Sequence, residues 1–218
     1  MSLKLVVGSK NYSSWSMRAG VAMRHSGVAY DEVVIPLGQP DTHEAIARHS
    51  DAGLVPILID DEQTIWDSLA IIEYLAETAP DGVIWPTDRA ARAMARSVSA
   101  EMHSGFGALR SDLPMNCRRR YDNFALGEGV EKDAARICAL WRDARNRFGR
   151  PLGGDYLFGA FSGADAMFAP VVSRFMTYGI PSDAVAGDYI AAMLDQPAVR
   201  FWVDAARQEP IIPRYEFN

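Results

Sequence analysis

The chain has 218 residues, of which 49% are hydrophobic and 23% are charged, and its formal net charge is −6 at pH 7. Residues 1–80 hold 5 Lys and Arg against 11 Asp and Glu, and this acidic half disfavours a nucleic-acid partner. No basic segment followed by an apolar run, and no stretch of about twenty apolar residues, indicates export or a membrane span, so we expect a cytoplasmic protein.

The first eighty residues predict a small α/β domain with its elements in a fixed order. Short apolar runs rich in β-branched residues are typical of strands, and apolar residues at helical spacing are typical of helices. The Val55–Pro56 bond, at the entrance to a strand, is a candidate for the cis form. The expected elements are strand Leu3–Gly8, helix Trp15–His25, strand Tyr30–Ile35, helix Thr42–His49, strands Val55–Ile59 and Gln63–Ile65, and helix Asp67–Thr78.

The stretch Ser13-Ser14-Trp15-Ser16 lies between the first strand and the first helix, where a thiol-handling protein would carry a Cys-x-x-Cys pair. The first N–H groups of a helix carry a partial positive charge and stabilise an anion such as a thiolate. A serine hydroxyl is too weak an acid to attack without a base, but it can donate a hydrogen bond to a sulfur anion. The motif therefore predicts chemistry on a borrowed thiol. The structural alternative is that these serines only cap the helix.

Proline and glycine in Ala79-Pro80-Asp81-Gly82 end the last helix of this region. We therefore expect a first domain over residues 1–80, a linker over 81–86 and an all-helical second domain over 87–218. Ser162 with Asp165 three positions later predicts a capping box, which is a folding role. The expected helices of the second domain are Asp88–Asp112, Val130–Phe148, Ala164–Tyr178, Ser182–Asp195 and Pro197–Gln208.

The chain has two cysteines, Cys117 and Cys138, and they lie far apart in the helical region. They form neither a Cys-x-x-Cys pair nor the spacing of a metal site, so the sequence predicts a reducing compartment and no bound metal. A cysteine at the first helix could form a mixed disulfide with a thiol. Serine cannot, which disfavours thiol–disulfide exchange.

The expected helix over 88–112 carries Met102, Phe106 and Arg110 along one stripe, which is more often typical of a core than of a binding site. His103 lies beside this stripe and is the residue there that can act as an acid or a base. The alternative for His103 is a solvent-facing or capping role.

Together these motifs resemble the cytosolic glutathione S-transferases over nearly the whole length of the chain. The serine loop is similar to that of the serine-type classes such as zeta. Gly53-Leu54-Val55-Pro56 resembles the family's cis-proline motif, and Asp67-Ser68 its acidic-serine pair before the third helix. The resemblance implies a thioredoxin-like first domain with a mixed four-stranded sheet, an all-α second domain and a homodimer.

The resemblance also implies a site for glutathione as co-substrate, with no metal. Ser13 or its neighbour Ser14 would hydrogen-bond the thiolate, and Asp67 would pair with the ligand's ammonium group. The remaining implied contacts are Trp15, Val55 and Pro56 along the extended tripeptide, Ser68 on the γ-glutamyl carboxylate, and Met102, His103, Phe106 and Arg110 in a pocket for the electrophile.

The leading expectation is a glutathione transferase, in which the thiolate attacks an alkyl or aryl electrophile. The first alternative is a zeta-like maleylacetoacetate isomerase, with Arg110 and Arg118 facing a dicarboxylate, although the zeta loop has Cys where this chain has Trp15. The second alternative is a non-catalytic glutathione-binding or scaffold module with the same fold.

Overall fold

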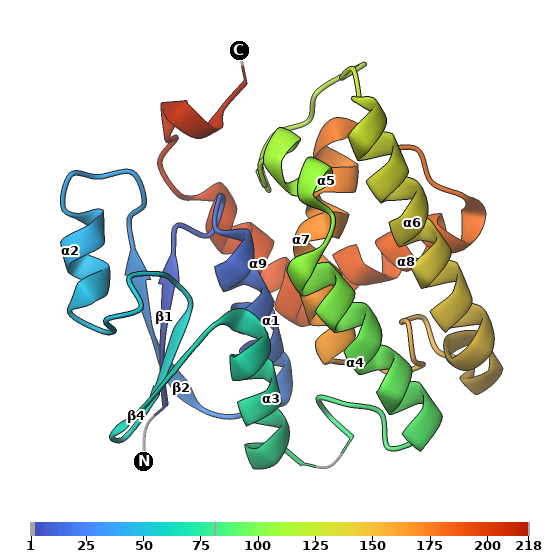
Figure 1. The fold of residues 1–218 in the computed structure, drawn as a ribbon, viewed down its shortest axis with the longest axis horizontal. Helices are drawn as coiled ribbons and strands as arrows, with labels where there is room; N and C mark the ends of the chain where they lie inside the picture. The colour runs from blue at the N-terminus through green and yellow to red at the C-terminus, as the bar shows by residue number, and fades with distance from the viewer. Residues whose placement is uncertain (1–2, 81, 218) are drawn as a thin grey trace.

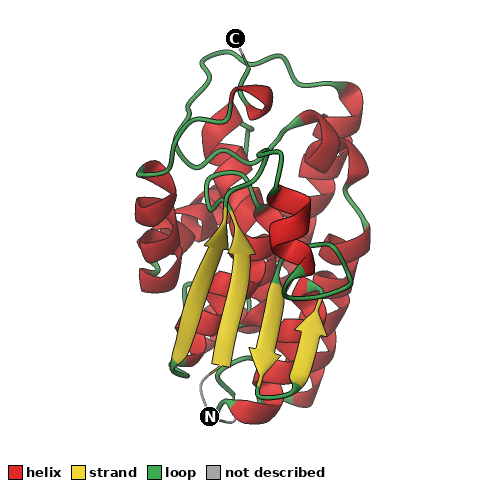
Figure 2. Cartoon of the chain, turned by 90° about the vertical axis from the view of Figure 1, so that its left-hand side faces the viewer, coloured by secondary structure: helices red, strands yellow, loops and turns green. Residues whose placement is uncertain are grey.

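The N-terminal half of the computed structural model contains a mixed four-stranded sheet (Figure 1). The structure describes residues 3–80 and 82–217. The strands lie in the order β2-β1-β3-β4, with β1 and β2 parallel and the other two pairs antiparallel (Figure 2). This arrangement confirms the predicted thioredoxin-like sheet. Its strands are β1 (Leu3–Gly8), β2 (Tyr30–Ile35), β3 (Ile57–Asp60) and β4 (Gln63–Trp66).

Helices cover both faces of this sheet because β1 is apolar on both sides. Leu5 and Val7 belong to the large core beneath α1 (Ser14–Ser26) and α3 (Ser68–Thr78). Val6 points the other way and packs with Ile46 of α2 (Thr42–Ala47) in a separate small cluster. The register pairs Leu3 with Tyr30 and Gly8 with Ile35.

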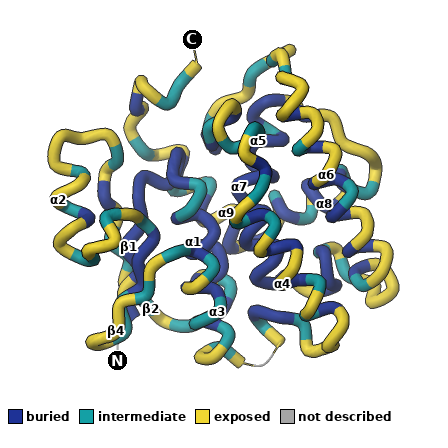
Figure 3. Tube along the Cα trace, in the orientation of Figure 1, coloured by how far each residue is buried: buried dark blue, intermediate teal, exposed yellow. Residues whose placement is uncertain are grey.

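The C-terminal half consists of helices around one buried helix, α7 (Gly163–Tyr178), which packs against α1, α4 and α8. Every residue of α7 except Met176 is buried (Figure 3). Ser162 and Asp165 form the predicted capping box at its start. The helices around it are α4 (Arg89–Ser104), α5 (Gly107–Asp112), α6 (Glu128–Ala144), α8 (Ala184–Asp195) and α9 (Pro197–Arg207).

The prediction of one long helix over 88–112 is wrong, because the chain breaks between α4 and α5. Gly105 leaves the helical conformation, and Phe106 adopts the left-handed one with φ 57° and ψ 46°. A Cβ at Gly105 would lie 2.7 Å from the carbonyl oxygen of Glu101, so only glycine fits this turn without rearrangement. Met102 and Arg110 therefore belong to two different helices.

Smaller differences lie at the ends of elements. The helix predicted over 42–49 ends at Ala47, and α6 continues as a π-helical turn over Arg145–Gly149. The chain after α9 runs as an extended segment with one 3-10 turn at Pro213–Tyr215, which the sequence did not indicate.

The predicted domain boundary at 81–86 stays a prediction, and Met1, Ser2, Asp81 and Asn218 lie outside the described residues. Within the described ranges, no helix combines the length and apolar character needed to cross a membrane.

Candidate functional site

The loop between β1 and α1 turns tightly and places three serines at the start of the helix. The N–H groups of Tyr12 and Ser13 both donate to the carbonyl of Ser9, at 3.1 and 2.8 Å. Ser13 is the N-cap, because its Oγ accepts the N–H of Ser16. It also donates to Ser16 Oγ at 2.8 Å, and that oxygen accepts the N–H of Gly8 at 3.0 Å. Ser13 and Ser16 are thus buried and bonded to each other.

Ser14 is the first residue of α1 and is half-buried. Its hydroxyl makes no hydrogen bond to any described residue, whereas that of Ser13 is already engaged. Both oxygens lie at the positive end of the helix dipole. Of the two predicted serines, Ser14 therefore has the hydroxyl that is free to meet a ligand.

A pocket of about 430 Å³ opens beside this helix start. The Val55–Pro56 peptide bond on its wall is cis, which confirms the prediction from the sequence. Its lining residues are Trp15, Ala52, Leu54, Val55, Pro56, Trp66, Asp67 and Ser68. Five of the predicted binding residues, from three separate stretches of chain, thus meet in one hollow.

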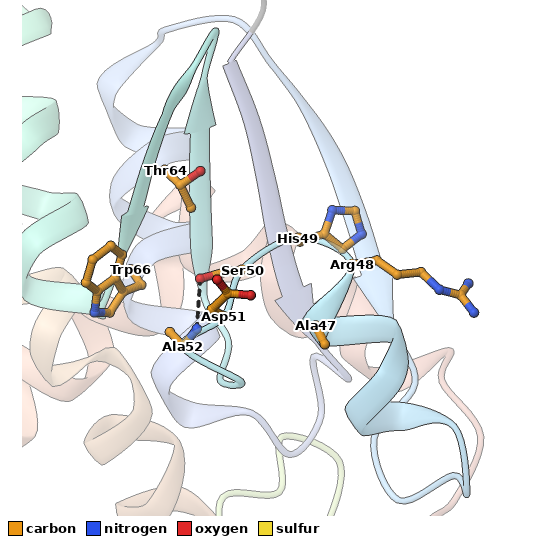
Figure 4. Close-up of a pocket in the computed structure, with 8 residues that line it drawn as sticks. All are labelled: Ala47, Arg48, His49, Ser50, Asp51, Ala52, Thr64 and Trp66. Carbon is orange, nitrogen blue, oxygen red and sulfur yellow. Dashed lines mark hydrogen bonds between the residues drawn. The ribbon is translucent and has the colours of Figure 1, made fainter.

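A second hollow of about 640 Å³ adjoins the first and shares Ala52 and Trp66 with it. Figure 4 shows Thr64 and Trp66 on the side of β4, and Arg48 pointing away from them. Ser50 Oγ accepts the N–H of Ala52, so the Ser50 side chain is already engaged by a residue of the same hollow. The five predicted binding residues lie in the first hollow, and none of them lines this larger one.

Asp67 and Ser68 form the start of α3 on the floor of the first pocket. Asp67 has a positive φ of 76° and is the N-cap, with Oδ1 accepting the N–H of Leu69 at 2.8 Å. The side chain of Ser68 is 0% exposed, and its Oγ has no hydrogen-bond partner among the described residues. The Ser68 hydroxyl is therefore buried and unsatisfied at the start of α3, which is uncommon for a polar group in a protein.

The second oxygen of Asp67 contacts His103 of α4, with 2.7 Å between Oδ2 and Nε2. The sequence indicated both residues but did not pair them, because they are 36 positions apart. The His103 ring also meets Trp15 edge to face, with 5.2 Å between ring centroids. His103 is therefore a neighbour of the pocket rather than a solvent-facing side chain.

Two arginines lie against Trp15 and a third, Arg174, lies close to them, and the sequence indicated only Arg110. The guanidinium carbons of Arg18 and Arg110 lie 4.3 and 5.5 Å from the centroid of the Trp15 ring. Arg18 is 1% exposed and Arg174 is 3% exposed. Burial, together with repulsion from Arg174 and Arg110, lowers the pKa of Arg18 to about 9. Burial likewise lowers the pKa of Arg174 to about 10, so Arg18 and Arg174 both stay cationic at neutral pH.

These arginines donate to backbone carbonyls and not to carboxylates. Arg18 bonds the carbonyl of Met102, Arg110 that of His103, and Arg174 those of Leu113 and Pro170. Two nitrogens of Arg18 and one of Arg110 are buried without a partner within the described ranges. Unpaired buried cations are costly, and of the three arginines Arg110 is the half-buried one that an anionic ligand could reach.

The other predicted pocket residues have different positions. Met102 and Phe106 are buried in the core, which agrees with the interpretation of their stripe as core rather than as a binding site. Arg118 donates to the carbonyl of Glu209 in the C-terminal segment. The sequence analysis missed Arg174. A signal was present, since Arg174 is one of only two charged residues in the apolar helix α7.

Residues 12–78 match the family model described as the N-terminal domain of glutathione S-transferase. A probable maleylacetoacetate isomerase of Caenorhabditis elegans is 36% identical over 99 residues, which cover 45% of this chain and 46% of that protein. The chain spans about half the length of the curated relatives it matches.

Two solved structures share the whole fold. A glutathione transferase homologue from Burkholderia with bound glutathione is 25% identical, with a TM-score of 0.71 over 96% of this chain and 100% of that one. A bacterial maleylpyruvate isomerase in the zeta class has a TM-score of 0.70 at 23% identity, over 95% of this chain and all of that one. The likeness to the maleylpyruvate isomerase is evidence of a shared fold alone.

Proposed function

Because the chain belongs to the glutathione S-transferase family, we propose that it is a glutathione-dependent isomerase acting on the cis double bond of a small maleyl-type dicarboxylate. This is the first alternative from the sequence, and the maleylacetoacetate isomerases among the curated relatives support it better than transfer to an alkyl or aryl electrophile. The family's general glutathione chemistry is common to both.

The pocket at Val55–Pro56 fits glutathione. Ser68 supplies an orphaned hydroxyl at the N-terminus of α3 for the γ-glutamyl carboxylate. Asp67 supplies a carboxylate beside it for the ammonium group, and His103 orients that carboxylate from the opposite side. Main-chain groups of Val55 are suited to pair with an extended peptide as an added strand would.

The thiol of a tripeptide in this pocket points toward the start of α1. Ser14 donates its free hydroxyl to the sulfur, and Ser13 holds the first turn in place. The helix dipole adds a partial positive charge of about one half at this point. Bound glutathione supplies a nucleophile that adds reversibly to a polarised double bond, allowing rotation about the former double bond before the nucleophile leaves.

The arginine cluster is the observation that carries the choice of substrate. Arg18 and Arg110 lie against Trp15, which also lines the pocket, and Arg174 lies close enough to Arg18 to lower its pKa. An aryl halide carries no charge for a guanidinium, whereas a carboxylate of the substrate can pair with the half-buried Arg110 through two parallel hydrogen bonds. Arg18 and Arg174 are too buried to touch the substrate, but they add positive charge behind Arg110. The same cations stabilise negative charge that develops on the substrate's carbonyl oxygen during addition.

The direct test is an isomerisation assay with Arg110→Gln. Maleylpyruvate or maleylacetoacetate is offered with glutathione, and loss of the cis substrate is followed by ultraviolet absorbance. We expect Arg110→Gln to raise the KM for the maleyl substrate about tenfold, because a charged hydrogen bond is lost, with little change in the KM for glutathione.

Arg150→Gln is the matched control, since Arg150 pairs with Asp188 on the exposed surface. No glutathione-dependent isomerisation by the unaltered protein would exclude the proposal. Conjugation of a chlorinated aromatic compound in its place would restore the transferase hypothesis, and glutathione binding without turnover of either class would support the scaffold module. A homodimer remains a prediction from the family resemblance, and a cytoplasmic location remains a prediction from the sequence.

A further inference from the structure

The loop that carries the serines is held by a residue from the far end of the chain. One oxygen of the Glu209 carboxylate accepts the N–H of Lys10 at 2.7 Å, and the other accepts the N–H of Asn11 at 2.9 Å. Trp202 of α9 donates its indole N–H to the carbonyl of Lys10 at 3.0 Å. Two consecutive N–H groups of this loop therefore have a single carboxylate as their partner.

A second carboxylate, that of Glu216, fastens the next residue of the loop. Its Oε1 accepts the hydroxyl of Tyr12 at 2.6 Å and the amide of Asn116 at 3.0 Å. Its Oε2 accepts from Arg119, and the Glu216 side chain is only 8% exposed. Burial alone would raise the pKa of Glu216, but these hydrogen bonds outweigh burial and hold that pKa below its ordinary value. Glu216 is thus an anion at neutral pH.

The segment Glu209–Phe217 also reaches both halves of the molecule. Ile212 and Arg214 lie against Gly38, where a Cβ would be 3.2 Å from each of them. Phe217 packs against Tyr121 and Phe124 of the helical half. In Figure 1 this red segment rises from α9 between α2 and α5, above the start of α1.

We propose that Glu209–Phe217 is a strap that positions Ser13 and Ser14, with Glu209 and Glu216 as its two positioning residues. The inference rests on the proposed function in one respect, that these serines hold a thiolate. Tyr12 directly precedes Ser13, and the turn of Ser9–Ser13 fixes where α1 begins. A shift in the N–H groups held by Glu209 therefore moves the serine hydroxyls and the end of the helix dipole together.

Glu209→Gln tests this in the full-length protein. A glutamine amide has one acceptor oxygen, so one of the two loop N–H groups loses its partner while the shape of the side chain is kept. We expect about tenfold lower kcat/KM and a displacement of the bound thiol's ionisation to higher pH, read from thiolate absorbance. Amide exchange at Lys10 and Asn11 will also accelerate.

Asp204→Asn is the matched control, because it removes the same charge from an exposed position on α9, where Asp204 pairs with Arg207. Glu216→Gln is a second, independent variant that loosens Tyr12 instead. Circular dichroism and the thermal midpoint identify a variant that has merely lost stability.

The proposal is overturned if Glu209→Gln accelerates amide exchange at Lys10 and Asn11 but has the same kcat/KM and the same thiol ionisation as Asp204→Asn. It is equally overturned if both Glu variants change only the thermal midpoint. If the unaltered protein binds glutathione but isomerises nothing, the proposed function fails. The strap is then judged on thiol ionisation and glutathione affinity alone.

Discussion

Ser13 and Ser14 are neighbours with different tasks, because one begins the helix and the other is its first residue. The Ser13 hydroxyl donates to the hydroxyl of Ser16 and accepts the backbone N–H of the same residue. Ser14 keeps its hydroxyl at the half-buried edge of α1. The sequence favoured Ser13 for the contact with the thiolate, with Ser14 as the alternative, whereas the burial of Ser13 favours Ser14.

Alanine substitutions separate the two roles. We expect Ser14→Ala to lower kcat/KM about ten- to a hundredfold, because a hydrogen bond to an ionised sulfur is lost. Ser13→Ala should mainly lower the free energy of unfolding, by about 1 kcal/mol, through loss of the N-cap. Steady-state kinetics and urea unfolding measure both. The reverse pattern, with turnover lost in Ser13→Ala and kept in Ser14→Ala, would contradict this assignment.

At the scale of elements, α1 is held between the sheet and α9 by a close contact. Gly20 lies on α1 where a Cβ would be 2.1 Å from the six-membered ring of Trp202. Both residues are buried, and Trp202 is also the donor to the loop carbonyl of Lys10. The contact therefore joins the serine helix to the last helix of the chain.

Gly20→Ala is expected to destabilise the fold by about 1–3 kcal/mol, since Trp202 must move to admit a methyl group. Gly187→Ala is the control within a helix, because a Cβ there has its nearest contact at 3.9 Å. That substitution should stabilise α8 by about 0.5–1 kcal/mol through its helix propensity. Thermal unfolding measures both. Equal midpoints for the two variants would show that the α1–α9 contact is not tight.

The start of α7 makes stability depend on pH. Asp165 is wholly buried, and desolvation raises its pKa to about 6 despite hydrogen bonds from Ser162 and Leu157. The folded protein thus binds this proton more tightly than the unfolded chain, where the pKa is about 4. The resulting stabilisation is present in full below about pH 4 and is lost as pH rises through about 6.

Asp165→Asn removes this dependence, and urea unfolding between pH 4 and pH 7 measures it. We expect the difference in unfolding free energy between the unaltered protein and the variant to fall by about 2–3 kcal/mol as pH rises over this range. A constant difference would show that the carboxyl does not change its protonation on folding in this range.

Across the whole molecule, local patterns predicted most of the fold and part of the site. The sheet, the cis bond at Val55–Pro56 and the capping box of Ser162 and Asp165 each follow from a few adjacent residues. The break before Phe106 was missed because one apolar stripe continues across it.

The features that the sequence did not predict join residues far apart in the chain. The contact of Asp67 with His103, the approach of Arg174 to Arg18 and the bond from Glu209 to Lys10 all depend on how the two halves pack. No spacing within the sequence specifies such packing. The proposed choice of a dicarboxylate substrate depends on these long-range contacts.

The fate of glutathione in a reaction with a maleyl substrate is the most decisive single measurement. One sample, holding the enzyme, excess cis substrate and substoichiometric glutathione, is followed by proton NMR. We expect complete conversion to the trans isomer with glutathione returned unchanged. Conversion that stops when glutathione is exhausted, with a thioether as the product, would contradict an isomerase and show a transferase instead.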